Sequence, residues 1–401
     1  MRVLLLNQFY LPDVAATGQL LGDLAEELHR RGHEVHVLCS RRPYAGGREE
    51  FPPEQVIGGA RVHRLAATGF GRAGFVGRIL DYLSFYLLAV RRAMSLPRMD
   101  ACVALSTPPF IALIGVLLKR RRKTKLICWT MDLYPGIAVA LNLLREGGLL
   151  HRALAGVARR IYSAADAIIA LGEVMASKLR HAGTEPEKIT IVHNWVPGEV
   201  VRFREPPQRE VVTLLYSGNL GMGHELDTAV RAAALLPDRS RVRLRFVGHG
   251  KMRKKLEHLV AELALERVEF APPCPLRELS ENLAGGDIHL ISQRPGTEGL
   301  IVPSKVYGVL AAGRATLYIG PEGTEVARII KQTDAGRVVP PGDINRTAEA
   351  LRELVNDSDL RRAMGRRGRK CYEDHFTRRR GVVQIADVIE SAFGRAGGQK
   401  T

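Results

Sequence analysis

Two glycine-rich segments in the second half of the chain have the composition of a phosphate-binding site. The first reads YSGNLGMG and places Gly218 and Asn219 directly after an apolar run. The second reads FVGHG and contains Gly248 and Gly250. Glycines let backbone amides approach a ligand, and a turn lined by amides suits the oxygens of a diphosphate. Neither segment completes GxGxxG or the P-loop pattern, so a dinucleotide or P-loop site is not favoured.

A loop of mixed charge, residues 293–305, supplies cations for such a site. It follows another apolar run, leads into a helical pattern and contains Arg294, Glu298 and Lys305. Arginine and lysine neutralise phosphate oxygens, and a carboxylate accepts hydrogen bonds from sugar hydroxyls. A charge run is more often a solvated loop, but the neighbouring glycine segments favour a ligand here. We therefore predict that Arg294 and Lys305 offset the charge of a bound diphosphate.

Polar residues also follow apolar runs in the first half of the chain. Asp13, Thr17 and Gly18 lie after the first such run, at the start of a helical pattern. We predict that Thr17 caps this helix, while Gly18 either contacts a ligand or only allows close packing. Asp132 follows the run LICW and either contacts an acceptor hydroxyl or caps the next turn. The sequence leaves these alternatives open.

Apolar periodicity predicts the elements that position these residues. Short runs rich in Val, Ile and Leu alternate with longer helical patterns, which is typical of βαβ units and doubly wound parallel sheets. The alternation stops in the charged segment VRFREPPQREVV and then begins again. We predict an α/β fold with domains at 1–200 and 201–376, and a helix and tail, 377–401, that packs on either domain. His193 and Asn194 either line a cleft or fill the interdomain hinge.

Charge and composition narrow the class of partner. The 401 residues include 59 Lys and Arg against 42 Asp and Glu, and the net charge of +17 favours nucleic acid, anionic lipid or a phosphate-bearing substrate. The even spread of charge, the 6% aromatic content and the lack of a recognised reader motif argue against nucleic acid. The five cysteines are scattered without a CxxC pair, so we expect no zinc site and a reducing compartment.

Two segments bear on membrane association. The opening MRVLLLNQFYLP is too short for a signal-peptide core, and two prolines interrupt the longest uncharged stretch, 101–118, so we expect a cytoplasmic protein without a membrane span. Residues 75–94 form an apolar and aromatic helical pattern, and residues 119–125 carry six cations. These segments either bind an anionic membrane face or form buried helices with solvated ends.

Several segments resemble the retaining GT-B glycosyltransferases of family 4. SGNLG, FVGHGKMRKKLE, PSKVYGVLAAGRA and GPEGTEVARII are similar to the C-terminal half of that family. NQFYLPDVAATGQLLGDL, DLYPG and IVHNWVP resemble the N-terminal half of its bacterial surface-polysaccharide members, including amino-sugar transferases of colanic-acid and O-antigen assembly. The resemblance extends from Met1 to about Phe393 and implies two facing Rossmann-like domains.

The resemblance also implies a reaction and a set of site residues. It implies transfer from a nucleoside-diphosphate sugar, with a UDP-sugar as the first candidate, to a polyprenyl-diphosphate-linked acceptor on the inner face of the cell membrane, with no required metal or cofactor. The donor site would comprise Gly18, Gly218, Asn219, Gly248, Gly250, Arg294, Gly299, Leu300 and Lys305. The acceptor site or cleft would comprise Asp13, Thr17, His193 and Asn194.

The chain departs from the family pattern at the catalytic positions. Two glutamates with seven residues between them are common before the AxG segment, and their places hold Leu300 and Gly308. Glu298 takes the first role only through a longer loop. The Arg/Lys pair common after SGN is replaced by GMGHE, and Met131 stands where many members have a histidine, which leaves Asp132 as the nearest ionisable group. The catalytic candidates are thus Asp132 and Glu298, and the alternative functions are a GT-B epimerase or hydrolase, or a nucleic-acid-binding protein.

Overall fold

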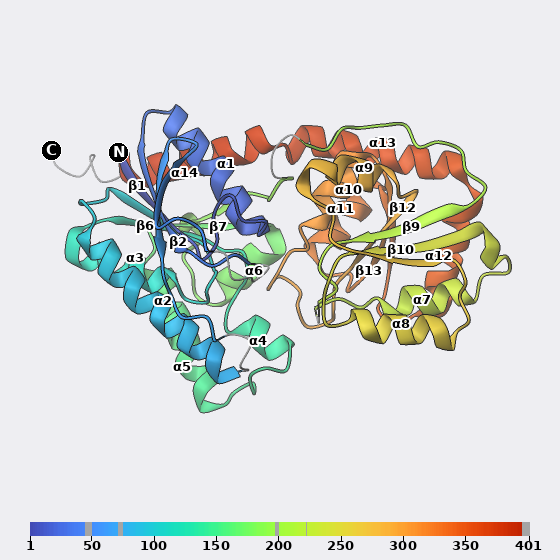
Figure 1. Ribbon diagram of the computed structural model, residues 1–401, viewed down its shortest axis with the longest axis horizontal. Coiled ribbons are helices and arrows are strands. Elements are labelled where there is room, and N and C mark those ends of the chain that lie inside the picture. Colours follow the sequence, from blue (N-terminus) through green and yellow to red (C-terminus); the bar gives the residue numbers. More distant parts are fainter. Residues whose placement is uncertain (45–49, 71–74, 197–199, 222, 395–401) are drawn as a thin grey trace. The chain divides into compact units, whose positions relative to one another are not determined.

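The chain forms two compact α/β units (Figure 1). The structure is a computed structural model that describes residues 1–44, 50–70, 75–196, 200–221 and 223–394. The N-terminal unit comprises Met1–Gly136, Leu144–His193 and the chain from Arg378 onward. The C-terminal unit comprises Ile137–Leu143 and Asn194–Thr377. The main change of unit therefore falls close to residue 200, where the apolar alternation of the sequence is interrupted.

An eight-stranded sheet forms the centre of the N-terminal unit, in the order β3-β4-β2-β1-β5-β6-β7-β8. Only the edge strand β3 runs antiparallel to its neighbour, and the other described pairs are parallel. The middle strands are buried on both faces, which explains their continuous apolar runs. The strands are β1 (Arg2–Leu6), β2 (Glu34–Ser40), β3 (Glu54–Ile57), β4 (Ala60–Leu65), β5 (Ala101–Ala104), β6 (Lys125–Trp129), β7 (Ala167–Ala170) and β8 (Ile189–Ile191).

Helices cover this sheet, and the last helix of the chain is one of them. The helices in this part of the chain are α1 (Ala16–Arg30), α2 (Phe75–Ser95), α3 (Ala112–Arg122), α5 (Leu149–Ala164), α6 (Glu173–His181) and the C-terminal α14 (Arg378–Gly394). The short helix α4 (Gly136–Ala140) also lies in this part of the chain, but most of it belongs to the C-terminal unit. Helix α14 packs against α1 and against the central strands. Arg31, at the end of α1, pairs with Asp387 at 2.7 Å and with Glu390 at 2.8 Å. The C-terminal helix therefore belongs to the N-terminal unit.

The C-terminal unit contains a six-stranded parallel sheet, in the order β11-β10-β9-β12-β13-β14. Because the order runs outward from β9 in both directions, the loops after β9 and β12 diverge, and ligands bind at such switch points in open α/β sheets. The strands are β9 (Val212–Ser217), β10 (Val242–Val247), β11 (Val268–Ala271), β12 (Ile288–Ser292), β13 (Ala315–Ile319) and β14 (Gly336–Val339). The helices are α7 (Asp227–Ala234), α8 (Arg253–Glu262), α9 (Leu279–Ala284), α10 (Lys305–Ala312), α11 (Glu325–Thr333), α12 (Ile344–Asn356) and α13 (Ser358–His375).

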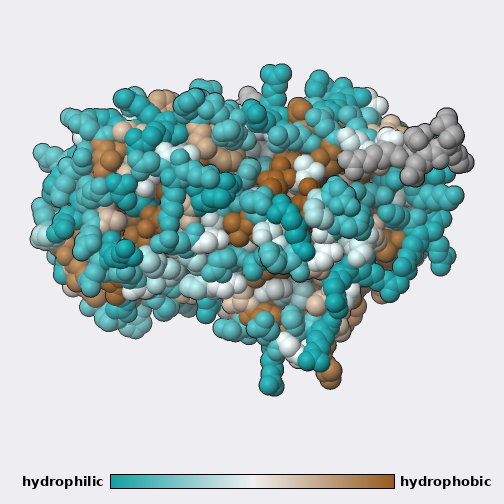
Figure 2. Space-filling view, turned by 180° about the vertical axis from the view of Figure 1, so that it is seen from behind, coloured by the Kyte–Doolittle hydropathy of each residue, from teal (hydrophilic) through white to brown (hydrophobic). Residues whose placement is uncertain are grey.

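The face drawn in Figure 2 carries mainly polar side chains, with hydrophobic ones in small groups. None of the helices within the described ranges is long and apolar enough to cross a bilayer. Among the same described residues, no group of three or more His, Cys, Asp or Glu side chains is placed to hold a metal ion. The five cysteines are all free thiols, and three of them are buried.

Candidate functional site

The loops after β9 and β12 meet at the switch point of the C-terminal sheet. Lys305, the first residue of α10, lies against Gly218, the residue that follows β9. Gly218 has a φ of +138°, and a Cβ atom there would lie 2.4 Å from Cε of Lys305. A Cβ atom at this position would displace the lysine side chain, and the positive φ also favours glycine. Gly218 and Lys305 were predicted from separate sequence segments to contact a diphosphate, and the structure places them side by side.

Two further side chains surround the Lys305 ammonium. Its Nζ lies 4.9 Å from the centre of the Tyr216 ring and 3.4 Å from Nε2 of His224. The face of an aromatic ring attracts a cation through its quadrupole. Burial lowers the pKa of Lys305 to about 8, so the charged form is the major one at neutral pH. A partly buried positive charge thus stands beyond the carboxyl ends of β9 and β12.

The hydrogen bonds of His224 define its protonation. Burial first, and then the charge of Lys305, lower the pKa of His224 to about 3, so the ring is neutral at working pH. Its Nδ1 lies 2.9 Å from the carbonyl oxygen of Ser292, the last residue of β12. A carbonyl oxygen only accepts, so Nδ1 carries the proton. Nε2 is therefore a bare acceptor that faces the ammonium of Lys305.

The two glycine segments pack against each other. Gly248 has a φ of +145°, and a Cβ atom there would lie 2.0 Å from the carbonyl oxygen of Gly218. The amide of Gly218 donates to Val247 at 2.8 Å, and that of Leu220 donates to His249 at 2.7 Å. The prediction of an amide-lined cradle is wrong for these two amides, because both already have partners within the protein. At Gly248 the glycine is needed for close contact between the two loops.

A buried polar network fixes the loop between β12 and α10. The hydroxyl of Tyr318 donates to Oε1 of Gln293 at 3.1 Å, and Nε2 of Gln293 donates to the hydroxyl of Thr297 at 3.1 Å. The amide of Arg294 donates to the carbonyl of Gly223 at 3.0 Å, which joins this loop to the one that carries His224. The loops on both sides of Lys305 are thus held together by main-chain and buried side-chain contacts.

The other donor-site candidates lie on these same loops. Asn219 is exposed, and its carbonyl oxygen accepts a hydrogen bond from the Tyr216 hydroxyl at 2.7 Å. Gly250 lies in the turn after β10, and a Cβ atom there would lie 2.1 Å from the carbonyl oxygen of Leu220 in the loop after β9. In the loop after β12, Gly299 is buried and the neighbouring side chains are partly exposed, namely those of Arg294, Glu298 and Leu300. Their roles toward a ligand stay predictions.

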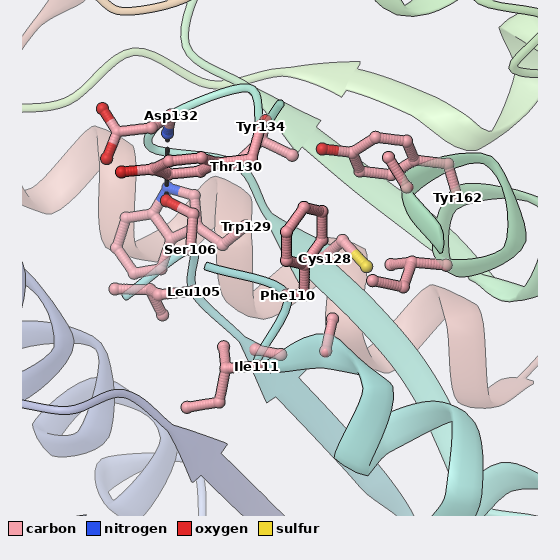
Figure 3. Close-up of a pocket in the computed structure, with 14 residues that line it drawn as sticks. Leu105, Ser106, Phe110, Ile111, Cys128, Trp129, Thr130, Asp132, Tyr134 and Tyr162 are labelled. Atoms are coloured by element: carbon pink, nitrogen blue, oxygen red, sulfur yellow. Dashed lines mark hydrogen bonds between the residues drawn. The ribbon is translucent and has the colours of Figure 1, made fainter. Parts of the chain in front are cut away.

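In the N-terminal unit, Asp132 lies shortly after β6, beside a cavity of about 30 Å³ (Figure 3). The amide of Asp132 donates to Oγ of Ser106 at 3.0 Å. Tyr134 and Tyr162 also line the cavity, and in Figure 3 the Asp132 carboxylate and Tyr162 lie at opposite ends of the group. A cavity of this size has room for a few water molecules at most, so a sugar does not fit inside it.

The surroundings of Asp132 change its acidity. Burial raises the pKa of its carboxyl group to about 6. Burial also raises the pKa of Tyr134 and of Tyr162, and the Asp132 charge adds to both effects. Taking a carboxylate out of water disfavours its charged form, which is the cause of the first shift. A carboxyl group with such a pKa can gain or lose a proton near neutral pH.

The loop after β1 is held by the buried side chain of Asp13. Its Oδ1 accepts a hydrogen bond from the amide of Ala15 at 3.0 Å, and its Oδ2 accepts one from the amide of Tyr44 at 2.7 Å. Both carboxylate oxygens therefore have backbone partners inside the N-terminal unit. This geometry gives Asp13 a structural part in shaping the loop, and its contact with an acceptor stays a prediction.

The start of α1 differs from the prediction. The helix begins one residue before Thr17, and its N-cap is Ala15, so the prediction that Thr17 caps the helix is wrong. The Thr17 hydroxyl instead accepts a hydrogen bond from Nδ2 of Asn7 at 3.2 Å, and this tertiary contact takes the side chain away from a capping role. A Cβ atom on Gly18 would lie 3.1 Å from the carbonyl of Phe9, so this glycine allows the loop to pack on the helix.

His193 and Asn194 stand where the chain passes from the N-terminal to the C-terminal unit. Asn194 is buried with 4% of its surface exposed, whereas His193 is partly exposed. Both residues therefore lie near the end of the first predicted domain. Whether they line a cleft or fill a hinge stays a prediction.

Sequence reasoning missed two residues of the Lys305 site, Tyr216 and His224. Tyr216 ends an apolar run, and such a run indicates a buried strand rather than a site. His224 lies in the GMGHE segment that stands where family members commonly have an Arg/Lys pair. That departure was the available signal, because a site that lacks its usual cations must obtain the charge elsewhere. The spacing of residues did not indicate which lysine His224 would meet.

Two family models together match most of the chain. The model described as "Glycosyl transferase 4-like domain" matches residues 16–195, and the one described as "Glycosyl transferases group 1" matches residues 199–371. The chain belongs to family 4 of the GT-B glycosyltransferases. Each matched segment covers most of one α/β unit, so the two halves of the fold correspond to the two halves of the family.

Known proteins show the same similarity over nearly the full length. The chain is 24% identical to the candidate colanic acid biosynthesis glycosyl transferase WcaI of Escherichia coli (strain K12), over 88% of this chain and 92% of that protein. Sucrose-phosphate synthase of Thermosynechococcus elongatus has a TM-score of 0.78, with 16% identity over 98% of this chain and 100% of that one. Anabaena HepE in complex with UDP-glucose has a TM-score of 0.69, with 15% identity over the same shares. These structures have the fold of this chain.

Proposed function

We propose that this glycosyltransferase of bacterial surface-polysaccharide synthesis moves a sugar from a nucleoside-diphosphate sugar to a polyprenyl-diphosphate-linked saccharide, with retention at the anomeric carbon. A UDP-sugar is the first candidate donor. The C-terminal unit binds the donor and the N-terminal unit binds the acceptor. The relation to WcaI supports the pathway, and the likeness to HepE, which was solved with UDP-glucose, supports the class of donor.

One observation carries the proposed donor site. Lys305 places a partly buried cation against Gly218 at the switch point of the C-terminal sheet. A diphosphate is the anionic part of a nucleotide sugar, and open α/β sheets bind ligands at this position. Arg294, in the loop that leads to the helix carrying Lys305, adds a second cation. The proposed donor contacts therefore gather around Lys305.

The proposed chemistry follows from that charge. The bond between the anomeric carbon and the diphosphate oxygen breaks, and negative charge builds up on the departing diphosphate. A fixed cation stabilises this charge more in the transition state than in the bound donor. The acceptor oxygen forms its bond on the same face of the sugar, and its proton passes to the departing phosphate oxygen. Asp132 contacts the acceptor hydroxyl, and its near-neutral pKa suits a group that shares a proton.

Thermal unfolding in the presence of nucleotide sugars tests the donor proposal. UDP-sugars should raise the Tm, by an amount that grows with the ratio of ligand concentration to Kd. The stabilising donor is then incubated with and without a polyprenyl-diphosphate saccharide. Product that forms only with acceptor, with the anomeric configuration of the donor, supports the proposal. Epimerised or hydrolysed donor without acceptor would show one of the alternative activities instead.

We also propose that the N-terminal unit binds an anionic membrane face, where a lipid-linked acceptor resides. Helix α2 exposes an apolar stripe at helical spacing, formed by Ile79, Leu80, Leu83 and Leu87. Leu87 has 74% of its surface exposed. The C-terminal end of the neighbouring helix α3 carries the exposed cationic side chains of Arg120, Arg121 and Lys123. Apolar side chains beside cations suit insertion into an anionic bilayer surface.

Vesicle co-sedimentation tests the membrane proposal. Vesicles with phosphatidylglycerol should retain the protein at low salt, and retention should fall as salt screens the charges. Leu87→Glu should lower retention severalfold, because it places a charge in the apolar stripe. Leu235→Glu is the matched control, since Leu235 is a similarly exposed leucine (55%) in the C-terminal unit. Equal binding to neutral and anionic vesicles would contradict the proposal.

A further inference from the structure

The Lys305 ammonium meets a neutral base where a carboxylate would be the ordinary partner. The bare Nε2 of His224 lies 3.4 Å from Nζ, and the opposite nitrogen of the ring is bonded to the carbonyl of Ser292. The ring also contacts the Tyr216 ring edge to face, with 5.7 Å between centres. The imidazole is therefore fixed on two sides and presents one lone pair to the lysine.

We infer that His224 is a positioning residue that holds the Lys305 ammonium over Gly218, so that the cation is in place when a diphosphate binds. The inference rests on the proposed function of Lys305 and names a residue that this function did not include. An ammonium has three N–H donors. One of them points to Nε2 in this arrangement, and the others are left for phosphate oxygens.

The neutral state of the imidazole is what makes this arrangement useful. A carboxylate beside Lys305 would also hold it, but it would cancel the positive charge and repel the incoming diphosphate. A neutral ring orients the amine through a lone pair and leaves the positive charge of Lys305 uncompensated. Tyr216 acts in the same sense, because the face of its ring attracts the cation without carrying a charge.

The loop that carries His224 has anchors other than the imidazole. The amide of Glu225 donates to Oγ of Ser292 at 2.6 Å, and the carbonyl of Gly223 accepts from the amide of Arg294 at 3.0 Å. The hydroxyl of Thr228 donates to the carboxylate of Glu225 at 3.1 Å. Because these bonds remain when the ring is removed, a substitution at His224 tests the contact with Lys305 rather than the folding of the loop.

Two conservative substitutions separate the two nitrogens of the ring. In His224→Gln, the amide oxygen can reach the position of Nε2 and accept from Lys305, while the bond to Ser292 is lost. In His224→Asn, the shorter amide can donate to Ser292, as Nδ1 does, but it does not reach Lys305. A role in orienting Lys305 predicts rescue by glutamine, whereas a purely structural role predicts rescue by asparagine.

Titration with UDP, followed by calorimetry, is the binding readout. We expect a Kd about fivefold higher for His224→Ala and His224→Asn, which is the size of the net contribution of one ordinary hydrogen bond, and a Kd within about twofold of the original for His224→Gln. In a Lys305→Met background, His224→Ala should add nothing further, because the residues act as one unit. His258→Gln, at an exposed histidine on α8, is the control with no expected effect.

A second readout needs no nucleotide. Competitive acetylation with mass spectrometry reports how reactive the Lys305 amine is, and we expect His224→Ala and His224→Asn to change that reactivity while His224→Gln leaves it near the original. Equal behaviour of the Gln and Asn variants in both readouts would overturn the inference. If UDP and GDP both fail to bind the unaltered protein, the proposed function fails, and the acetylation result still decides whether His224 holds Lys305.

Discussion

Lys305 in the C-terminal unit and Asp132 in the N-terminal unit are both partly buried, but they have different neighbours. Burial lowers the pKa of Lys305 to about 8 and raises that of Asp132 to about 6, so both move toward neutrality from opposite sides. Lys305 has an aromatic face and an imidazole lone pair beside it. Asp132 lies beside a cavity of about 30 Å³ lined largely by apolar and tyrosine side chains.

The difference shows how one physical effect can serve two purposes. The Tyr216 ring and the His224 lone pair attract the Lys305 ammonium and fix its position. Such a fixed cation suits the stabilisation of the negative charge of a diphosphate. The backbone amide of Asp132 is fixed by its hydrogen bond to Ser106. Its carboxyl group has a pKa of about 6, so it can exchange a proton near neutral pH. We therefore propose that the C-terminal unit supplies a fixed charge and that the N-terminal unit supplies a contact to the acceptor hydroxyl. Four predictions test this contrast.

The largest effect should come from the backbone under the lysine. Gly248→Ala places a Cβ atom 2.0 Å from the carbonyl of Gly218, at a φ of +145°. We expect a loss of about 3 kcal/mol in the free energy of unfolding, since the two loops must move apart. Urea unfolding measures it. Gly223→Ala is the matched control in a neighbouring loop, because a Cβ atom on Gly223 would meet no other atom within 4 Å. Equal stability of the two variants would contradict the packing of the glycine segments.

The next effect concerns the carboxyl group of the N-terminal unit. Asp132→Asn keeps the shape of the side chain and removes its ability to take a proton. We expect kcat to fall about 100-fold with little change in the KM for the donor, as is typical when a hydrogen-bond partner that acts in the transition state is removed. Steady-state transfer assays measure both constants. Full transfer activity in this variant would exclude a catalytic role for Asp132.

Removal of the cation should act on the donor instead. Lys305→Met keeps the length of the side chain and removes its charge, and we expect the Kd for UDP to rise about 30-fold, in line with the loss of charge-assisted hydrogen bonds. The Tm without ligand should stay level or rise, because a buried charge is no longer desolvated. A Kd unchanged by the substitution would show that the diphosphate binds away from Lys305.

The smallest effects are changes of the Kd and of kcat with pH, and they should distinguish Lys305 from Asp132. Lys305 loses its proton as the pH rises through about 8, so the Kd for UDP should rise about tenfold per pH unit above that value. In the Lys305→Met variant, the Kd should not change with pH in this range. Asp132 gains a proton as the pH falls through about 6, so kcat should decline below that pH. If both pH dependences appeared in the Kd and neither in kcat, the proposed difference between the two units would be wrong.

Much of the fold could be predicted from the sequence, because strands and helices leave local patterns. Apolar runs such as that of β1 and the helical spacing of Leu20, Leu24 and Leu28 in α1 are set by which face is buried. The family segments then indicated two units of the same kind. The start of α1 was misplaced because a tertiary hydrogen bond from Asn7, not local capping, uses the Thr17 hydroxyl.

The sequence by itself determined which loops carry glycines and charges. It also indicated that each of these loops follows a strand of a parallel sheet. The tertiary structure alone decided that Lys305 meets Gly218, Tyr216 and His224, and that α14 returns to the N-terminal unit. The physical reason is the range of the interactions. Periodicity reflects contacts between near neighbours in the chain, whereas the contact between His224 and Lys305 joins residues 81 positions apart and depends on the strand order that places β9 beside β12.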